Sequence, residues 1–211
     1  MVVHILTTVS GPLVNGIELS TSVDVVLLAF RLTLGAMILA HGYHHIFGSG
    51  GVSGTAQWFS GIGFRPARVH AWMSGTVELA VGAALILGLL TALASAGLIG
   101  TMAVAGWAAH RRNGFFIFRD GYEYVLVVGV AALTLAAVGP GTISADNALG
   151  IVDYGAQHSG LLGSVAVVLA GGGGLLGAAL LLGIGWRPER EPTGQSHRPS
   201  TSTDEQARGE A

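Results

Sequence analysis

The run "VDVVLLAFRLTLGAMILAHGYHHIF" (Val23–Phe47) decides the fold class of this chain. A helix that crosses a bilayer needs about 20 mostly apolar residues, and this run is long enough to do so. Four further runs of the same kind follow, at His70–Leu90, Ala92–Ala109, Gly121–Val138 and Gly160–Trp186. The chain is therefore predicted to be an all-α polytopic membrane protein with a four-helix bundle core plus a fifth, C-terminal transmembrane helix.

The whole-chain composition agrees with a membrane protein. The 211 residues have a mean hydropathy of +0.62 and only 10% charged residues, whereas a soluble domain carries about 25%. A net charge of −2 gives no sign of nucleic-acid binding. Cysteine is absent, which excludes disulfides, thiol catalysis and cysteine-ligated zinc or iron–sulfur sites.

Arginine supplies all ten basic residues, and their placement predicts the topology. With five spans, nine of them fall on one side, in three groups: Arg65 and Arg68; Arg111, Arg112 and Arg119; and Arg187, Arg190, Arg198 and Arg208. The positive-inside rule makes that side cytoplasmic. We therefore expect a multi-pass protein of a bacterial inner membrane, with the N-terminus outside and the C-terminus in the cytoplasm.

This topology gives an expected organisation along the chain. Residues 1–22 form an extracytoplasmic segment, 23–146 the four-helix core, 147–159 an extracytoplasmic loop, 160–186 the added helix and 187–211 a disordered cytoplasmic tail. Residues 48–69 are expected to be a loop with Trp58 and Phe59 near the interface. Four glycines, Gly171–Gly174, predict that the fifth helix bends or packs closely there; a soluble apolar hairpin is the weaker interpretation of that segment.

Two charged residues, Arg31 and Glu78, lie well inside predicted helices, and Glu123 lies near the start of the fourth. An ionised side chain in the bilayer core costs several kcal/mol unless it is paired. The predicted helix ends put Arg31 and Glu78 about 6 Å apart in depth, so we expect that they can pair. The pair would either fix the helix register or line a polar pocket for a ligand head group or a proton.

Three histidines end the first run, and two share a face with Arg31. On a helical wheel His45 lies about 40° and His41 about 80° from Arg31, while His44 points elsewhere. His70, His110 and Glu123 are expected at the same depth, which predicts a cluster at the inner end of the bundle. Three interpretations stay open: a metal or haem site, partly hydrated interfacial histidines, or a proton-handling or quinone-facing site. The H-x-x-x-H spacing lacks the catalytic Glu of a zinc motif, so no metal site is predicted.

Four blocks of the chain resemble the DoxX family. They are "RLTLGAMILAHGYHHIFG" with Arg31, Gly35, His41, Gly42 and Gly48; "GIGFRPARVHAWMSGTVELAVGAALILGLLTALAS" with Glu78 and Gly82; "HRRNGFFIFRDGYEY" with Asn113, Gly114, Phe115, Gly121 and Glu123; and "GPGTISAD" with Gly139, Pro140, Gly141, Ser144 and Asp146. The blocks occur in order over residues 31–146. Two departures stand out: His45 replaces a lysine that is common in the family, and the fifth helix and tail extend beyond the family core.

The resemblance implies a four-helix membrane core and a loosely defined redox role. The family is named after a subunit of a thiosulfate:quinone oxidoreductase, and mycobacterial relatives are associated with a membrane complex that couples superoxide detoxification to thiol handling. The chain is thus expected to be a non-catalytic membrane subunit of a redox assembly, linked to sulfur chemistry or oxidative stress. Its partners would be the lipid bilayer and membrane or cytoplasmic redox proteins, with quinone as its only candidate cofactor.

The expected polar intramembrane site consists of Arg31 and Glu78, with Glu123 and either His41 or His45 as proton partners. The sequence leaves open whether the chain is an enzyme in its own right. Two alternatives stay open: a scaffold or assembly factor with no redox role, and a carrier of protons or small solutes. The carrier is disfavoured because neither an inverted repeat nor paired broken helices are evident.

Overall fold

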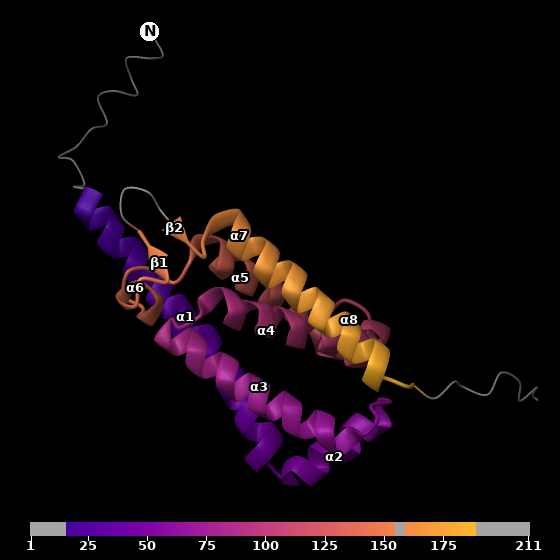
Figure 1. The fold of residues 1–211 in the computed structure, drawn as a ribbon. Helices are drawn as coiled ribbons and strands as arrows, with labels where there is room; N and C mark the ends of the chain where they lie inside the picture. The colour runs from indigo at the N-terminus through magenta and orange to yellow at the C-terminus, as the bar shows by residue number, and fades with distance from the viewer. Residues whose placement is uncertain (1–15, 155–158, 189–211) are drawn as a thin grey trace, which may run out of the picture.

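The computed structural model describes residues 16–154 and 159–188 as a helical bundle (Figure 1). The larger helices are α1 (Gly16–Phe47), α2 (Gly51–Gly61), α3 (Ala67–Leu87), α4 (Thr91–Ala105), α5 (Glu123–Val138) and α8 (Gly173–Gly185). The short elements are the π-helical turns η1 (Gly106–His110) and η4 (Val168–Gly172), the 3₁₀ turns η2 (Arg111–Asn113) and η3 (Ile117–Arg119), the helical turns α6 (Ala145–Ala148) and α7 (Gly163–Val167), and the strands β1 (Val152–Asp153) and β2 (Ser159–Gly160).

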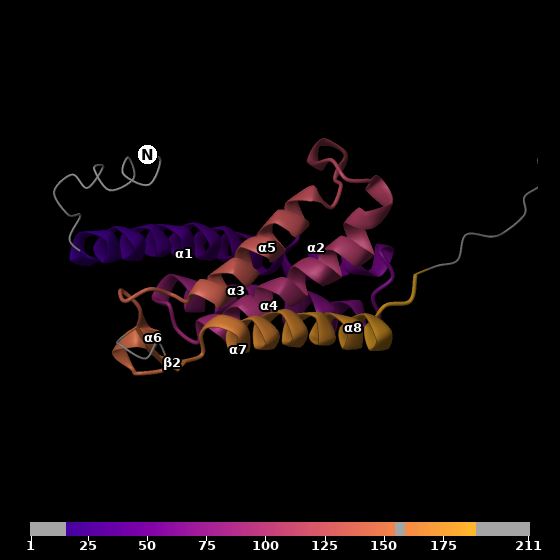
Figure 2. The same cartoon turned by 90° about the horizontal axis from the view of Figure 1, so that it is seen from above.

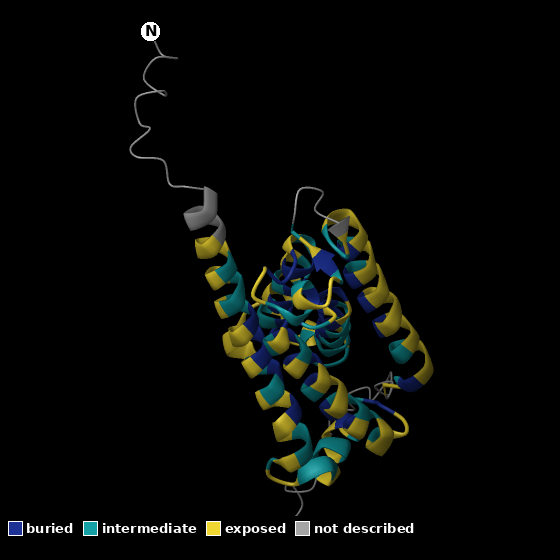
Figure 3. Cartoon of the chain, turned by 60° about the vertical axis from the view of Figure 1, so that its left-hand side comes forward, coloured by how far each residue is buried: buried dark blue, intermediate teal, exposed yellow. Residues whose placement is uncertain are grey.

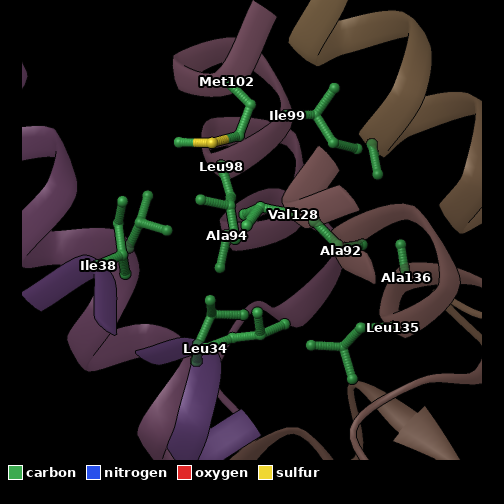
Figure 4. Close-up of a cluster of buried hydrophobic side chains, with 14 of the residues drawn as sticks. Leu34, Ile38, Ala92, Ala94, Leu98, Ile99, Met102, Val128, Leu135 and Ala136 are labelled. Carbon is green, nitrogen blue, oxygen red and sulfur yellow. The ribbon is translucent and has the colours of Figure 1, made fainter. Parts of the chain in front are cut away.

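Helix α4 is central and contacts α3, α5 and α8 (Figures 1 and 2). Helix α1 packs along α3, and α2 closes the same end of that pair. A buried apolar cluster joins the layers, with Leu34 and Ile38 from α1, Leu98 and Met102 from α4, and Leu135 from α5 (Figure 4). The outward faces of the helices are exposed (Figure 3) and carry large apolar side chains, as expected for surfaces covered by lipid.

Four helical segments of the described residues are long and apolar enough to cross a bilayer: Thr21–Phe47, Ala67–Leu87, Thr91–Asn113 and Gly163–Gly185. Helix α5 is apolar but has only 16 residues, which extend over about 24 Å. The predicted all-α polytopic membrane fold is confirmed. The first, second, third and fifth predicted spans correspond to these four segments, and the fourth is the shorter helix α5.

The expected loop at residues 48–69 was wrong, because it contains helix α2. Val52, Ala56 and Phe59 recur at helical spacing and pack in a small apolar cluster with Phe64 and Ala71. The expected loop at 147–159 also has structure, since it includes the end of α6 and strand β1, which pairs antiparallel with β2. Helix α2 depends on apolar contacts with Phe64 and Ala71, and β1 depends on pairing with β2. The local composition of either segment does not reveal these contacts.

The four glycines of the fifth span remain helical and do what their composition predicted. The chain passes through the π-helical turn η4 directly before α8. Gly174 then packs so tightly on α4 that a Cβ atom there would lie 2.6 Å from the carbonyl oxygen of Ala96. Small residues allow this close approach between membrane helices.

Candidate functional site

Glu78 is a buried carboxyl group at the interface of α3 and α1, with a side chain that is 4% exposed. Ser74, one turn earlier on α3, donates a hydrogen bond to Glu78 Oε1 at 2.8 Å. His45 of α1 brings its Nε2 atom to 3.7 Å from the same oxygen. The other oxygen, Oε2, is buried and has no hydrogen-bond partner among the described residues. The site therefore contains a carboxyl and an imidazole that can exchange a proton.

A seam of glycines brings α1 and α3 close enough for this contact. Gly35 faces Gly82 and Gly42 faces Gly75, so the helices run antiparallel with two glycine pairs seven residues apart. A Cβ atom at Gly42 would lie 2.8 Å from the carbonyl oxygen of Gly75, and one at Gly82 would lie 2.8 Å from that of Gly35. The backbones are thus in direct contact above and below Glu78, as small-residue interfaces in membranes permit.

The expected Arg31–Glu78 pair was wrong. Arg31 is fully buried, and its guanidinium donates hydrogen bonds to the carbonyl oxygens of Leu85 at 3.2 Å, Ile86 at 3.1 Å and Ile143. The glycine register explains the difference, because it places Arg31 opposite Ile86, which lies eight residues from Glu78 and so about 12 Å along α3. The predicted helix ends had underestimated this offset by about half.

Arg31 belongs to a polar network at the end of the bundle where α3 ends. Gly88 ends that helix with a left-handed φ of 62°, and the guanidinium occupies the space that a Cβ atom there would take. Asp146 accepts hydrogen bonds from the backbone N–H groups of Leu90 at 2.6 Å and Thr91 at 2.8 Å, at the start of α4. Its own N–H donates to the carbonyl oxygen of Gly88. These bonds fasten the segment after α5 to the α3–α4 turn.

The "GPGTISAD" segment is held by the same network. Asp24 of α1 accepts bonds from the N–H and hydroxyl groups of Thr142, and Ser144 caps α6 by accepting a bond from Asn147. The Tyr154 hydroxyl accepts a hydrogen bond from the N–H of Gly141 at 2.8 Å. Burial raises the pKa of the Tyr154 phenol, so this side chain stays neutral.

The expected histidine cluster is not assembled in the structure. Of the histidines that the structure describes, only His45 reaches Glu78. His41 is exposed, and its ring lies 6.4 Å from that of Tyr124. His70 lies against Phe64 at 5.1 Å between ring centres and under Gly185 of α8, and His110 lies 2.7 Å from the carbonyl oxygen of Asp120. Among the described residues, no group of three or more histidines, aspartates and glutamates could hold a metal ion.

Glu123 is also separate from this site, at the start of α5. Its carboxylate accepts a hydrogen bond from the N–H of Ile117 at 3.1 Å, and its own N–H donates to Phe115 at 2.8 Å. Asn113 donates to the carbonyl oxygen of Asp120 at 3.2 Å within the same loop. The polar groups of the segment "HRRNGFFIFRDGYEY" therefore bond to the backbone of the same segment and stabilise the α4–α5 connection.

Ser74 is a candidate site residue that sequence reasoning missed. It precedes Glu78 by four residues, which places the two side chains on one helix face, so the spacing was visible in the sequence. Ser74 also lines an apolar groove between α3, α4 and α8, with a volume of about 590 Å³. We call this the Ser74 groove and define it by His70, Ser74, Val77, Leu93, Gly100 and Leu181. Through Ser74, the buried carboxyl is one hydrogen bond away from the wall of this groove.

Comparison with known proteins gives a match to one protein family. The DoxX family model matches residues 26–111, which include Arg31, His45, Ser74, Glu78 and the glycine seam. The "GPGTISAD" segment and α5 lie outside the matched residues. No curated protein and no solved structure matches the chain. Residues 26–111 are therefore a DoxX domain.

Proposed function

We propose that the chain is the membrane subunit of a quinone-linked redox assembly, in which another protein carries the redox centre. The observation that carries this proposal is the Glu78–His45 pair. Ser74 connects Glu78 Oε1 to a groove, and Glu78 Oε2 is buried without a partner among the described residues. A polar or ionisable group inside a membrane is expensive and is a functional-site hypothesis by default. The role in sulfur chemistry or oxidative stress rests on the family resemblance alone.

The Ser74 groove fits the shape and polarity of a quinone. Ligand pockets have volumes of about 300–1,000 Å³ and mostly apolar walls with a few polar groups, and this groove of about 590 Å³ follows that pattern. His70 and Ser74 lie on its α3 wall, and the rest is mostly apolar, with small and aliphatic residues of α4 and α8 together with Phe59 and Phe64. A quinone, when bound, carries electrons and protons together. Ser74 and His70 would face its polar ring, and the apolar wall would accommodate its tail.

The protein side of the site would hold and transfer a proton. Ser74 bonds to Glu78 Oε1, and His45 lies next to that oxygen, so a proton can pass from the groove wall to the carboxyl and on to the imidazole. His45 also packs 6.0 Å from the ring of Phe59 in α2, near the helix end that leads out of the bundle. Glu123 and His41 have no part in this proposal because each is engaged elsewhere.

We also infer that the protein resides in a bacterial inner membrane with its arginine-rich end in the cytoplasm. Contacts among the arginine-bearing segments support this. Arg65 and Arg187 bond through their backbones to Gly185 and Gly63, and the Arg111 guanidinium lies 5.6 Å from the Trp186 ring centre. The three segments therefore share one end, which the positive-inside rule assigns to the cytoplasm.

The test is purification in mild detergent, followed by mass spectrometry of bound proteins and extracted quinones. We expect a quinone and an oxidoreductase to copurify with the full chain. Gly177→Leu should reduce the quinone content, because Gly177 lines the groove and nothing lies within 4 Å of the place that a Cβ atom there would take. Gly183→Leu is the matched control, since it is equally open and on the same helix but outside the groove lining.

The same preparation distinguishes the alternatives. Absence of both quinone and oxidoreductase from a folded preparation contradicts the redox proposal, and equal quinone content in the two leucine variants rules out the Ser74 groove. A scaffold predicts that Glu78→Gln lowers protein level or partner recovery. A carrier predicts pH-dependent flux in proteoliposomes that contain the purified chain alone.

A further inference from the structure

A second groove opens on the other side of α4, between α4, α5 and the η4–α8 helix. It has a volume of about 550 Å³. We call it the Arg111 groove and define it by Met102, Trp107, Arg111, Tyr122, Leu126 and Leu133. Among its lining residues, Arg111 is the only charged one, and Tyr122 supplies a hydroxyl group. The groove is thus apolar along most of its length, with the Arg111 cation at one end.

Arg111 is held at that end by aromatic rings. Its guanidinium carbon lies 4.1 Å from the ring centre of Trp107 and 5.6 Å from that of Trp186. No carboxylate of the described residues forms an ion pair with it. Stacking on aromatic faces orients a guanidinium while leaving its in-plane N–H donors available. The donors are suited to a phosphate, which arginine binds with two parallel hydrogen bonds.

The length of the groove corresponds to one leaflet. From Tyr122 to Leu133 it follows α5 for eleven residues, about 16 Å, and half of a hydrocarbon core is about 15 Å. Trp107 and Tyr122 lie at the charged end, as aromatic residues do at a membrane interface. Both π-helical turns border the groove, η1 through Gly106 and η4 through Gly171. Such turns often occur at functional sites.

The charge at this end selects for an anion. Among the described residues, the connections and helix ends there carry six arginines and two carboxylates: Arg65, Arg68, Arg111, Arg112, Arg119 and Arg187 against Asp120 and Glu123. The Glu123 carboxylate already accepts a backbone hydrogen bond. Basic pockets between membrane helices on the cytoplasmic side bind anionic head groups.

We propose that the Arg111 groove binds one anionic phospholipid, with its phosphate on Arg111 and one acyl chain along α4 and α5. The choice of an anionic lipid follows from the arginine excess, which repels the positive group of a zwitterionic head. The acyl chain follows from the apolar lining and the length of one leaflet. The site is separate from the Ser74 groove, which lies on the opposite side of α4 and is lined by α3.

The experiment measures binding of phosphatidylglycerol to the full chain in detergent, by native mass spectrometry and by the rise in melting temperature. Phosphatidylcholine and tail-free glycerophosphate serve as comparison ligands. We expect phosphatidylglycerol to bind best. Arg111→Gln should weaken it about fivefold, from about 1 kcal/mol per cation at the surface, whereas Arg112→Gln, outside the groove lining, should have a smaller effect.

A second variant tests the acyl chain independently of the charge. Gly129 lines the groove, and a Cβ atom there would have its nearest neighbour, Met102 Cβ, at 3.9 Å. Position 129 thus has room for a Cβ atom, and the larger side chain of Gly129→Leu should block the acyl chain; the melting temperature of this variant without lipid tests whether it folds. Equal losses for the two arginine variants, unchanged binding by Gly129→Leu, or equal protection by glycerophosphate or phosphatidylcholine would each overturn the proposal.

Discussion

Arg31 and Glu78 are both buried in the membrane domain, but they differ in their hydrogen-bond partners. Arg31 donates to three backbone carbonyl groups and fills the space beside Gly88, and of its guanidinium nitrogens only Nε is buried without a partner among the described residues. Glu78 has one hydrogen bond, from Ser74, and a histidine at 3.7 Å, while its second oxygen has no partner among the described residues. A buried charged group with several hydrogen-bond partners can hold a structure together, whereas a buried polar group with few partners costs stability.

This difference separates a structural charge from a candidate functional one. The hydrogen-bond partners of Arg31 are backbone carbonyl groups, which cannot change protonation state. The neighbours of Glu78 are a hydroxyl and an imidazole, groups of the kind that relay protons, and the hydroxyl lines a groove. We therefore expect substitutions of Arg31 to reduce mainly stability and substitutions of Glu78 to reduce mainly function.

Replacing Arg31 should have the largest effect on stability. Arg31→Met removes the donors to Leu85, Ile86 and Ile143 and leaves the Leu85 carbonyl with only the N–H of Gly88 as a donor among the described residues, which should lower the free energy of unfolding by about 3 kcal/mol. Thermal unfolding in detergent measures the loss. Arg31→Lys keeps the charge but not the fork geometry, so it should be intermediate. An Arg31→Met variant as stable as the unmodified protein would contradict the structural role of Arg31.

Gly42→Ala should have an intermediate effect on stability, because it disturbs the glycine seam that holds α1 against α3. The added methyl group would lie 2.8 Å from Gly75 O and Leu79 N, so α1 and α3 must separate, at a cost of about 1–3 kcal/mol. His45 should move away from Glu78 as a result. Gly177→Ala is the control, because nothing lies within 4 Å of that position. Equal melting temperatures for the two variants would show that the seam is not tightly packed in the membrane.

Glu78→Gln should have the smallest effect on stability and a large effect on proton transfer. The amide keeps the shape and can still accept the bond from Ser74, while it removes a buried ionisable group. We expect the free energy of unfolding to change by less than about 1 kcal/mol, with loss of quinone-dependent activity in the purified assembly. Unfolding and activity are measured on one preparation. If stability falls as far as for Arg31→Met, Glu78 is structural too.

The sequence predicted the bundle well because its signal is local. Apolar runs of sufficient length identify the membrane helices, and two buried charges stood out within them. The pairing of those charges failed because it depended on helix register, which is set by the contacts of Gly35 with Gly82 and Gly42 with Gly75. Composition does not reveal such contacts between distant segments.

The histidine cluster failed for a related reason. The predicted depth of His45 along α1 placed it correctly near the inner half of α3. Depth alone, however, does not determine which helices are neighbours. His70 lies against Gly185 of α8, and His110 bonds within its own loop. The sequence did not predict α2, because a segment of eleven residues with several glycines is typical of a loop. The packing of Phe59, which stabilises this helix, is visible only in the structure.

The shortness of α5 has a consequence for the surrounding bilayer. Its 16 residues cover about 24 Å, whereas the hydrocarbon core is about 30 Å thick. Such hydrophobic mismatch is accommodated by local thinning of the bilayer, which draws lipid head groups and water inward beside α5. The membrane around this protein is thus expected to be asymmetric, thinnest on the α5 side and of ordinary thickness along α1.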